Sequence, residues 1–462
     1  MKRISESIKI QAYDDPAVSD SAGNRTLFAM LLVMPCVLAL AYGANDSASL
    51  VLIALLTAVF SLVWFVRAIR RRFFELRFSL LYLPLVGLML LSIVQLLPLS
   101  EPAVDPSLIS VQPSAALSFD SYSTRIFLFR FFALSLFFAG ALTFTDTIRR
   151  RRILITALTI FGGVIGFGSI IQRLVSPEAI YGVSRPANAI PFGPYVNQHH
   201  FAALMVLLSG PVISELFVRR RLETRLLYLI AAVLMAVPVL LTGSRGGILA
   251  YLTMVAAIAL AAVRFHEKRV VSDKMLVPIS LGLLVFAVII GLAIFLGGDE
   301  SILRGFGLNY GAGDFTSGRR YFWAVAWQIF LAHPLLGVGM DAFGVAFTQF
   351  DTRNGFYRVE QAHNDYLQML ADGGIAGFLL TVGFLFLFFR EALRRIKESA
   401  GDRSGLRHFR LGAFAGCCGV LVHSFFDFPL RTWSNAYFFM LLVAIATAKI
   451  KEEFVAADRG DG

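Results

Sequence analysis

Residues able to do chemistry stand out in this sequence where polar segments interrupt long apolar runs. The longest such segment, residues 297–373, carries Arg319 and Arg320, and the run QAHNDYLQMLADGG near its end carries His363. Arginine holds phosphate oxygens through paired charge-assisted hydrogen bonds, and histidine accepts a proton near neutral pH. A segment this long without the composition of a linker usually carries function, so we expect it to hold part of a reactive site.

Shorter connecting segments carry further candidates. The run LTGSRGGILAYL predicts a tight turn with Arg245 at its tip, because Gly246 and Gly247 allow a sharp turn and the close approach of a ligand. The run PFGPYVNQHHFAAL contains His200, and Arg185 precedes that run. The structural alternatives are a helix-end anchor for Arg245, an exposed loop charge for Arg185 and a helix-start contact for His200.

Ionisable residues also occur within the apolar runs. In VHSFFDFPLRTW, His423 and Asp427 are four residues apart, which predicts that they share one helical face as a structural pair. Arg130 lies about one turn into the apolar run 126–145, where a charged residue is a functional candidate by default. The alternative for Arg130 is snorkelling to the membrane surface together with Arg125.

Three short helices are expected within 297–373. The run RRYFWAVAWQIFLAH has helical apolar spacing and stops at Pro334, and GMDAFGVAFTQF predicts a second helix. The third, EQAHNDYLQML, ends at two glycines and places His363, Leu367 and Leu370 on one face. Such helices are typical of interfacial segments that cover a membrane-embedded cavity.

The composition predicts the setting of these segments. The chain has 462 residues, of which 57% are hydrophobic and only 16% are charged, so we expect an all-α integral membrane protein. A hydrocarbon core about 30 Å thick needs roughly 20 apolar residues for each crossing. Twelve apolar segments approach that length: 27–42, 48–66, 78–98, 126–145, 153–172, 200–218, 226–243, 247–263, 276–296, 374–389, 411–427 and 435–448.

The net charge of +11 indicates topology rather than nucleic-acid binding. Arginine clusters follow every second apolar segment, as at 67–72, 149–152 and 219–221, which is the bias of cytoplasmic loops. This pattern predicts both termini in the cytoplasm and places 297–373 on the far side, between the ninth and tenth spans. A nucleic-acid partner is therefore not expected.

The organisation predicted from these patterns has four parts. They are a cytoplasmic tail (1–26), five transmembrane helices (27–172), a core (173–430) and a last helix with a cytoplasmic tail (431–462). All three cysteines, Cys36, Cys417 and Cys418, fall within apolar segments, so neither a disulfide framework nor a metal site is indicated. No cofactor is expected.

At these runs the chain resembles the O-antigen ligase and polymerase-like superfamily of bacterial membrane glycosyltransferases. The resemblance covers about 185–430 and rests on PFGPYVNQHHFAAL, LTGSRGGILAYL, GRRYFWAVAWQIFLAHPLLGVGMDAF, QAHNDYLQMLADGGIAGF and VHSFFDFPL. It implies a GT-C-type fold in the bacterial inner membrane with a periplasmic active site. The implied reaction moves a glycan from undecaprenyl diphosphate to a glycan or lipid A-core acceptor without a metal.

The resemblance also implies roles for individual residues. His363 is the general base, next to Asn364, while Arg245 and either Arg319 or Arg320 hold the diphosphate. Because Arg319 and Arg320 are adjacent, the resemblance does not distinguish which of the two holds the diphosphate. For His363 the structural alternative is a hydrogen-bonded residue on the surface of a helix, and for the paired arginines it is a solvated helix start.

Three functions are compatible with the sequence. The first is a ligase of the O-antigen type, and the second is a polymerase that joins carrier-linked repeat units by nearly the same chemistry. The third is a secondary transporter with twelve spans, for which internal repeats and a central connector are typical. The long polar segment here lies off-centre, which favours the glycosyltransferases.

Overall fold

The computed structural model describes residues 22–99, 115–186, 189–218, 221–264, 318–353, 355, 359–400 and 405–450. Within these ranges the chain is helical and has no strands. The helices are α1 (Ala22–Leu40), η2 (Tyr42–Ala44), α2 (Ser47–Arg71), α3 (Tyr82–Gln95), α4 (Ser121–Phe144), α5 (Ile148–Val175), α6 (Gln198–Glu215), α7 (Leu222–Leu241), α8 (Arg245–Arg264), α10 (Arg319–Ala332), α11 (Phe343–Phe350), α12 (Asp365–Glu398), α13 (Leu406–His423), η5 (Pro429–Arg431) and α14 (Trp433–Thr447).

The predicted all-α membrane class is confirmed. Helices occupy eleven of the twelve apolar segments, and the remaining segment, 276–296, lies outside the described residues. By length and composition, six of the described helices can cross a membrane: α1, α2, α4, α5, α7 and α12. The count of twelve spans, the sidedness of 297–373 and the four-part organisation stay predictions.

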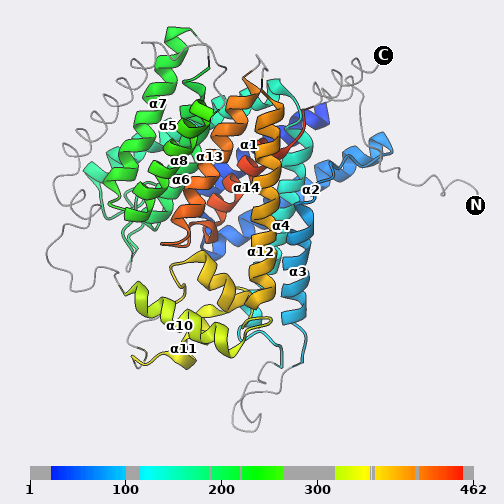
Figure 1. Ribbon diagram of the computed structural model, residues 1–462, viewed down its shortest axis with the longest axis vertical. Coiled ribbons are helices and arrows are strands. Elements are labelled where there is room, and N and C mark those ends of the chain that lie inside the picture. The colour runs from blue at the N-terminus through cyan, green and yellow to red at the C-terminus, as the bar shows by residue number, and fades with distance from the viewer. Residues whose placement is uncertain are drawn as a thin grey trace, which may run out of the picture.

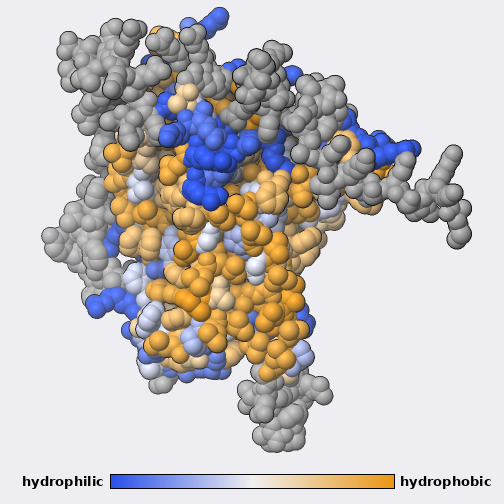
Figure 2. Space-filling model, turned by 45° about the vertical axis from the view of Figure 1, so that its right-hand side comes forward, coloured by the Kyte–Doolittle hydropathy of each residue, from blue (hydrophilic) through white to orange (hydrophobic). Residues whose placement is uncertain are grey.

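Most helices run side by side, while α10 and α11 lie across one end of the bundle (Figure 1). Exposed apolar side chains cover the outside of α3 and α12, for example Leu83, Leu90, Leu379 and Phe386. The face shown in Figure 2 has a broad hydrophobic band with hydrophilic residues beyond both of its edges. This arrangement fits helices whose outer surfaces contact lipid chains.

The middle of the bundle depends on a close contact between α6 and α13. A Cβ atom added at Gly210 would overlap the carbonyl oxygen of Gly412, so the two backbones approach as closely as small residues allow. Helix α13 also packs against α8, and α14 contacts α4 and α12. The contact brings the start of α6, with His200, near the residues that follow α13.

The first two short helices predicted within 297–373 are confirmed as α10 and α11. They share a small hydrophobic core with the first part of α12, formed by residues such as Val325, Ile329, Phe343 and Ala371. Helix α10 ends at Ala332 and is followed by His333 and Pro334, as expected.

The third predicted helix is wrong in its start, whereas its predicted end at the two glycines is confirmed. It begins at Asp365, and the φ of 59° and ψ of −161° at Gly374 interrupt the helical geometry before the predicted tenth span, which continues α12. His363 therefore precedes the helix and does not share a face with Leu367 and Leu370. The segment Asp365–Gly373 lies before this break, and the part after it is long enough to cross a membrane by itself.

The predicted turn around Arg245 is also corrected. The turn is made by Gly243, which has a φ of 59°, and Arg245 is the first residue of α8. Gly246 and Gly247 are helical, and their missing side chains permit packing instead. A Cβ at Gly246 would lie 2.7 Å from the ring of His423, which places the first turn of α8 beside the end of α13.

Candidate functional site

The carboxylate of Asp427 joins side chains from three separate parts of the chain. It is 1% exposed, and its Oδ1 lies 3.1 Å from Nδ1 of His363. Its Oδ2 lies 3.4 Å from a terminal guanidinium nitrogen of Arg319, and Nε2 of His200 lies 3.8 Å from Oδ1. A buried charge with several partners at the end of a helix bundle is a strong candidate for a functional group.

Asp427 reaches this position because it lies just beyond the end of α13. Its backbone N–H donates to the carbonyl oxygen of His423, and its Oδ1 accepts a hydrogen bond from the N–H of Phe428 (3.0 Å). The predicted helical pair of His423 and Asp427 is therefore wrong. Neither ring nitrogen of His423 has a hydrogen-bond partner among the described residues.

His363 is held in place by strained backbone and a helix cap. Its φ is 52°, an uncommon value for a non-glycine residue that persists only where surrounding structure enforces it. Asn364 supplies this support: its Oδ1 accepts from the N–H groups of Tyr366 and Leu367, and its Nδ2 donates to Phe425 O (3.1 Å). Asn364 thus acts by positioning its neighbour.

The contact with Asp427 defines the chemistry available to His363. A carboxylate at Nδ1 favours the tautomer with its proton there, which leaves Nε2 as the acceptor nitrogen. Burial favours the neutral carboxyl of Asp427, but the His200 and His363 rings outweigh burial and hold its pKa well below its usual range. Asp427 therefore stays ionised, and the pair can take a proton on His363.

The two adjacent arginines of α10 differ in their surroundings. Arg319 is partly exposed and points toward Asp427, whereas Arg320 is exposed. Arg245 is exposed at the first turn of α8, which lies beside His423. Arg319 is thus the member of its pair that the structure brings to the Asp427 cluster, which we define as Asp427 with its partners His200, Arg319 and His363.

The remaining candidates divide into two groups. His200 is buried, with Nδ1 2.6 Å from Oγ1 of Thr432, and it belongs to the Asp427 cluster. Arg185 is exposed between α5 and α6. Arg130 lies nearly three turns into α4, since this helix begins at Ser121, earlier than predicted.

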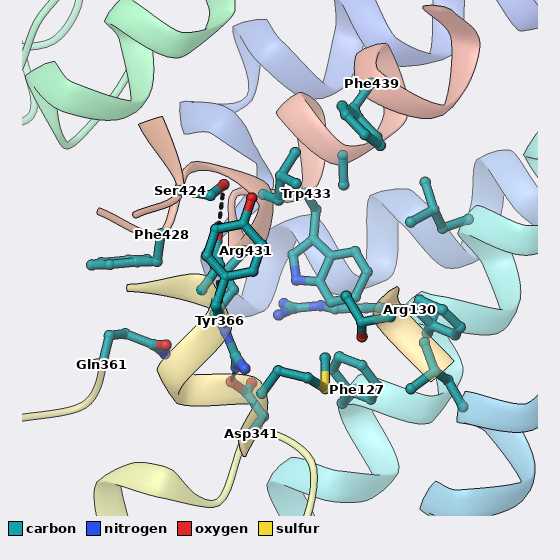
Figure 3. A pocket seen from close by; sticks show the side chains of 18 of the residues that line it. Phe127, Arg130, Asp341, Gln361, Tyr366, Ser424, Phe428, Arg431, Trp433 and Phe439 are labelled. Atoms are coloured by element: carbon teal, nitrogen blue, oxygen red, sulfur yellow. Dashed lines mark hydrogen bonds and ion pairs between the residues drawn. The ribbon is translucent and has the colours of Figure 1, made fainter. Parts of the chain in front are cut away.

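A cavity of about 800 Å³ has His363 among its lining residues. Figure 3 shows this cavity from close by. Residues of α3, α4, α12, α13 and α14 line it, together with the segment 359–363. Its size is typical of pockets that bind small molecules. Neither Arg245 nor Arg319 lines the cavity. His363 does, and its ring also contacts Asp427, so it connects the cavity with the Asp427 cluster.

Arg431 anchors one wall of this cavity. It lies 2.8 Å from Asp341, 2.6 Å from Asp372 and 3.9 Å from Asp365. Burial opposes its charge, but these carboxylates raise its pKa above the usual value. The network joins the loop before α11, the start of α12 and η5, and so fixes the elements on both sides of His363.

Sequence reasoning missed the role of Asp427 and the network of Arg431. One signal was present, because Asp427 is the only acidic residue of VHSFFDFPLRTW and a lone charge in an apolar run is a functional candidate. In the part of the chain that the structure describes, no group of three or more His, Cys, Asp and Glu side chains is arranged to hold a metal ion.

Helices long and apolar enough to cross a membrane, with a histidine on a buried carboxylate and an arginine near it at one end, define this chain as a helical membrane protein. Residues 230–382 match the family model described as O-antigen ligase. The resemblance drawn from the motifs is confirmed over this range, which contains Arg245, Arg319, Arg320 and His363 but not Asp427. No curated protein matches the chain. The match supports an enzyme of the O-antigen ligase or polymerase type at this coarse level.

Proposed function

We propose that this protein transfers a glycan from undecaprenyl diphosphate to lipid A-core or a similar acceptor at the periplasmic face of the inner membrane. The observation that carries the proposal is the 3.1 Å contact between Nδ1 of His363 and buried Asp427, with Arg319 on the same carboxylate. The family match over 230–382 supports the same reaction type.

In the proposed reaction, a hydroxyl oxygen of the acceptor bonds to the anomeric carbon of the donor sugar. The bond from that carbon to the diphosphate oxygen breaks, and undecaprenyl diphosphate leaves with the electron pair. Nε2 of His363 takes the hydroxyl proton, while Asp427 holds the ring and stabilises the imidazolium. One direct displacement inverts the configuration at the sugar carbon.

The arginines act on the leaving group in this proposal. Diphosphate is a good leaving group once its negative charge is held, and the planar guanidinium gives two parallel hydrogen bonds to phosphate oxygens. Arg319 supplies one such contact and Arg245, at the neighbouring start of α8, supplies another. The amides at the first turn of α8 also favour an anion there.

A polymerase that joins carrier-linked repeat units is the second candidate, because it uses the same donor and chemistry. The lipid-linked glycans of a deletion strain distinguish the two functions. Accumulation of long carrier-linked chains would identify a ligase, and accumulation of single units would identify a polymerase. A normal glycan profile would contradict both and would favour the transporter alternative.

The periplasmic placement can be tested by cysteine labelling. We expect S317C, within the long polar segment, to react with a membrane-impermeant reagent in intact spheroplasts, and S404C to stay unlabelled. Both positions lie outside the described residues. Labelling of S404C but not S317C would reverse the topology and remove the proposed periplasmic site.

A further inference from the structure

The cavity beside His363 has two chemically different parts. Its polar lining includes Asn45, Arg130, Asp341 and Gln361. Apolar side chains from four helices form much of the remaining wall: Leu85 and Leu88 of α3, Phe131 and Leu134 of α4, Phe384 and Leu385 of α12, Phe439 and Met440 of α14. A ligand that fills both parts must be amphiphilic.

The apolar part extends deep into the bundle. Phe384 lies ten residues beyond the break at Gly374, and Leu134 lies thirteen residues beyond Ser121, where α4 begins. At 1.5 Å per helical residue these positions are about 15 and about 20 Å from the site end of the helices. That depth is about half to two-thirds of a hydrocarbon core roughly 30 Å thick. Sugar hydroxyls would find no partners there, whereas a hydrocarbon chain would.

Arg130 provides a positive charge inside the cavity, about 14 Å from the start of α4 by the same rise per residue. In the described part of the chain, its terminal nitrogen donates to the carbonyl oxygen of Asp46 (3.2 Å), and its guanidinium lies 5.7 Å from the ring centre of Trp433. It makes no direct ion pair there, although Asp341 and Asp46 lie near enough to interact with its charge, and its buried Nε has no hydrogen-bond partner. Figure 3 shows Arg130 extending into the cavity beside Trp433, with Arg431 against Asp341 on another wall.

Arg130 and Arg431 therefore differ although they line one cavity. The charge of Arg431 is balanced by three carboxylates, whereas Arg130 is available to an anionic ligand. A partly desolvated guanidinium with unfilled donors is suited to phosphate. A phosphate with a hydrocarbon chain would place its charge on Arg130 and its chain among the deeper apolar residues.

We propose that this cavity binds the second, glycan-accepting substrate as a lipid phosphate, with Arg130 on its phosphate and its hydrocarbon chain between α3, α4, α12 and α14. His363 then lies between two anion sites, since the Arg319 and Arg245 site for the donor is outside the cavity. The assignment of the bound lipid as the acceptor rests on the proposed function. The inference that the cavity binds a lipid phosphate rests on the lining of the cavity and is independent of that function.

Binding to purified full-length protein in lipid nanodiscs tests the phosphate contact. The probe is a C55 polyprenyl phosphate without sugar, and the matched variants are Arg130→Gln and Arg125→Gln on the same helix, Arg125 being exposed. Arg130→Gln should weaken binding by about tenfold or more, because a charge-assisted hydrogen bond is lost, and Arg125→Gln should not. Equal affinities of the two variants would overturn the assignment of Arg130.

A second pair of variants tests the chain site. Thr381 lines the cavity, while the next residue, Val382, is 42% exposed on the outer surface of α12. Thr381→Trp should abolish the preference for the C55 probe over a C10 polyprenyl phosphate, and Val382→Trp should keep it. Retention of the full chain-length preference in Thr381→Trp would show that the chain lies elsewhere.

Transfer kinetics decide which substrate occupies the cavity. With a lipid-phosphate acceptor, Arg130→Gln should raise KM for the acceptor about tenfold and leave KM for the donor unchanged. A rise in donor KM alone would assign the cavity to the carrier lipid and overturn the acceptor site. Absence of transfer by the wild-type protein would contradict the proposed function, and the binding results would still report on the cavity.

Discussion

Arginines with several polar contacts occur at both ends of the helix bundle, but their burial and their partners differ. At the end opposite the site, Arg151 donates to the carbonyl oxygens of Thr145, Ile445 and Ala448 at 2.8 to 3.0 Å, and Arg410 donates to those of Arg395 and Ala448. At the site end, Arg319 and Arg431 face carboxylates.

The difference shows how one residue type serves two purposes. Arg151 and Arg410 are fully buried and satisfy the last carbonyls of helices, where a positive charge also complements the helix dipole. The donors of Arg151 are used by the fold in three carbonyl contacts. Arg130 and Arg319 are partly exposed, and they keep donors for a ligand. Variants at the two ends should therefore separate activity from stability.

The largest effect is expected for His363→Ala at the site end. Loss of a positioned general base should reduce kcat by about 10²–10⁴-fold, while binding of the carrier lipid changes little because the arginines remain. Transfer and carrier binding should be measured on the same purified variant. Lost binding with a normal rate at saturation would mean that His363 holds the donor, and unchanged transfer would remove it from the site.

Asp427→Asn should have the next largest effect. The amide keeps the size of the carboxylate but neither stabilises an imidazolium nor fixes the tautomer of His363, so we expect a fall in kcat of about 10²-fold. KM for the donor should change less than kcat. A full rate for Asp427→Asn at normal protein levels would leave Asp427 a purely structural role.

Lysine substitutions at the three arginines should have smaller and unequal effects. Lysine keeps the charge but loses the paired planar contact, so Arg319→Lys and Arg245→Lys should lower kcat/KM for the donor by about tenfold or more. Arg320→Lys, at the exposed neighbouring position, is the matched control and should retain wild-type kinetics. Equal sensitivity of Arg319 and Arg320 would contradict the distinction drawn from their surroundings.

Arg151→Met should have the smallest effect on catalysis and should act on stability instead. The apolar side chain leaves three carbonyl oxygens without this donor, each of which costs about 1–3 kcal/mol when buried. Thermal unfolding in detergent should shift downward by several degrees while kcat stays within about twofold. A large loss of kcat in well-folded Arg151→Met would show that the two ends are not separable.

Much of this architecture was predictable because it depends on local patterns. Apolar runs of about 20 residues fixed the membrane helices, and Pro334 ended α10 as expected. The start of α12 was also predictable, because Asn364 is a favoured N-cap residue. The predicted third helix nevertheless began before Asn364 and ran through it. The site required contacts that no local pattern contains. His363 and Asp427 are 64 residues apart, and the choice between Arg319 and Arg320 depends on how α10 is turned.

Because one carboxylate serves both Arg319 and His363, arrival of the donor should change the strength of the base. A diphosphate that draws Arg319 toward itself removes a competing positive charge from Asp427, whose negative charge then acts more fully on the imidazole. Asp427 should therefore stabilise an imidazolium at His363 most strongly in the donor-bound state. We therefore expect ordered kinetics, in which the donor binds first and His363 acts on an acceptor hydroxyl only in the donor-bound complex.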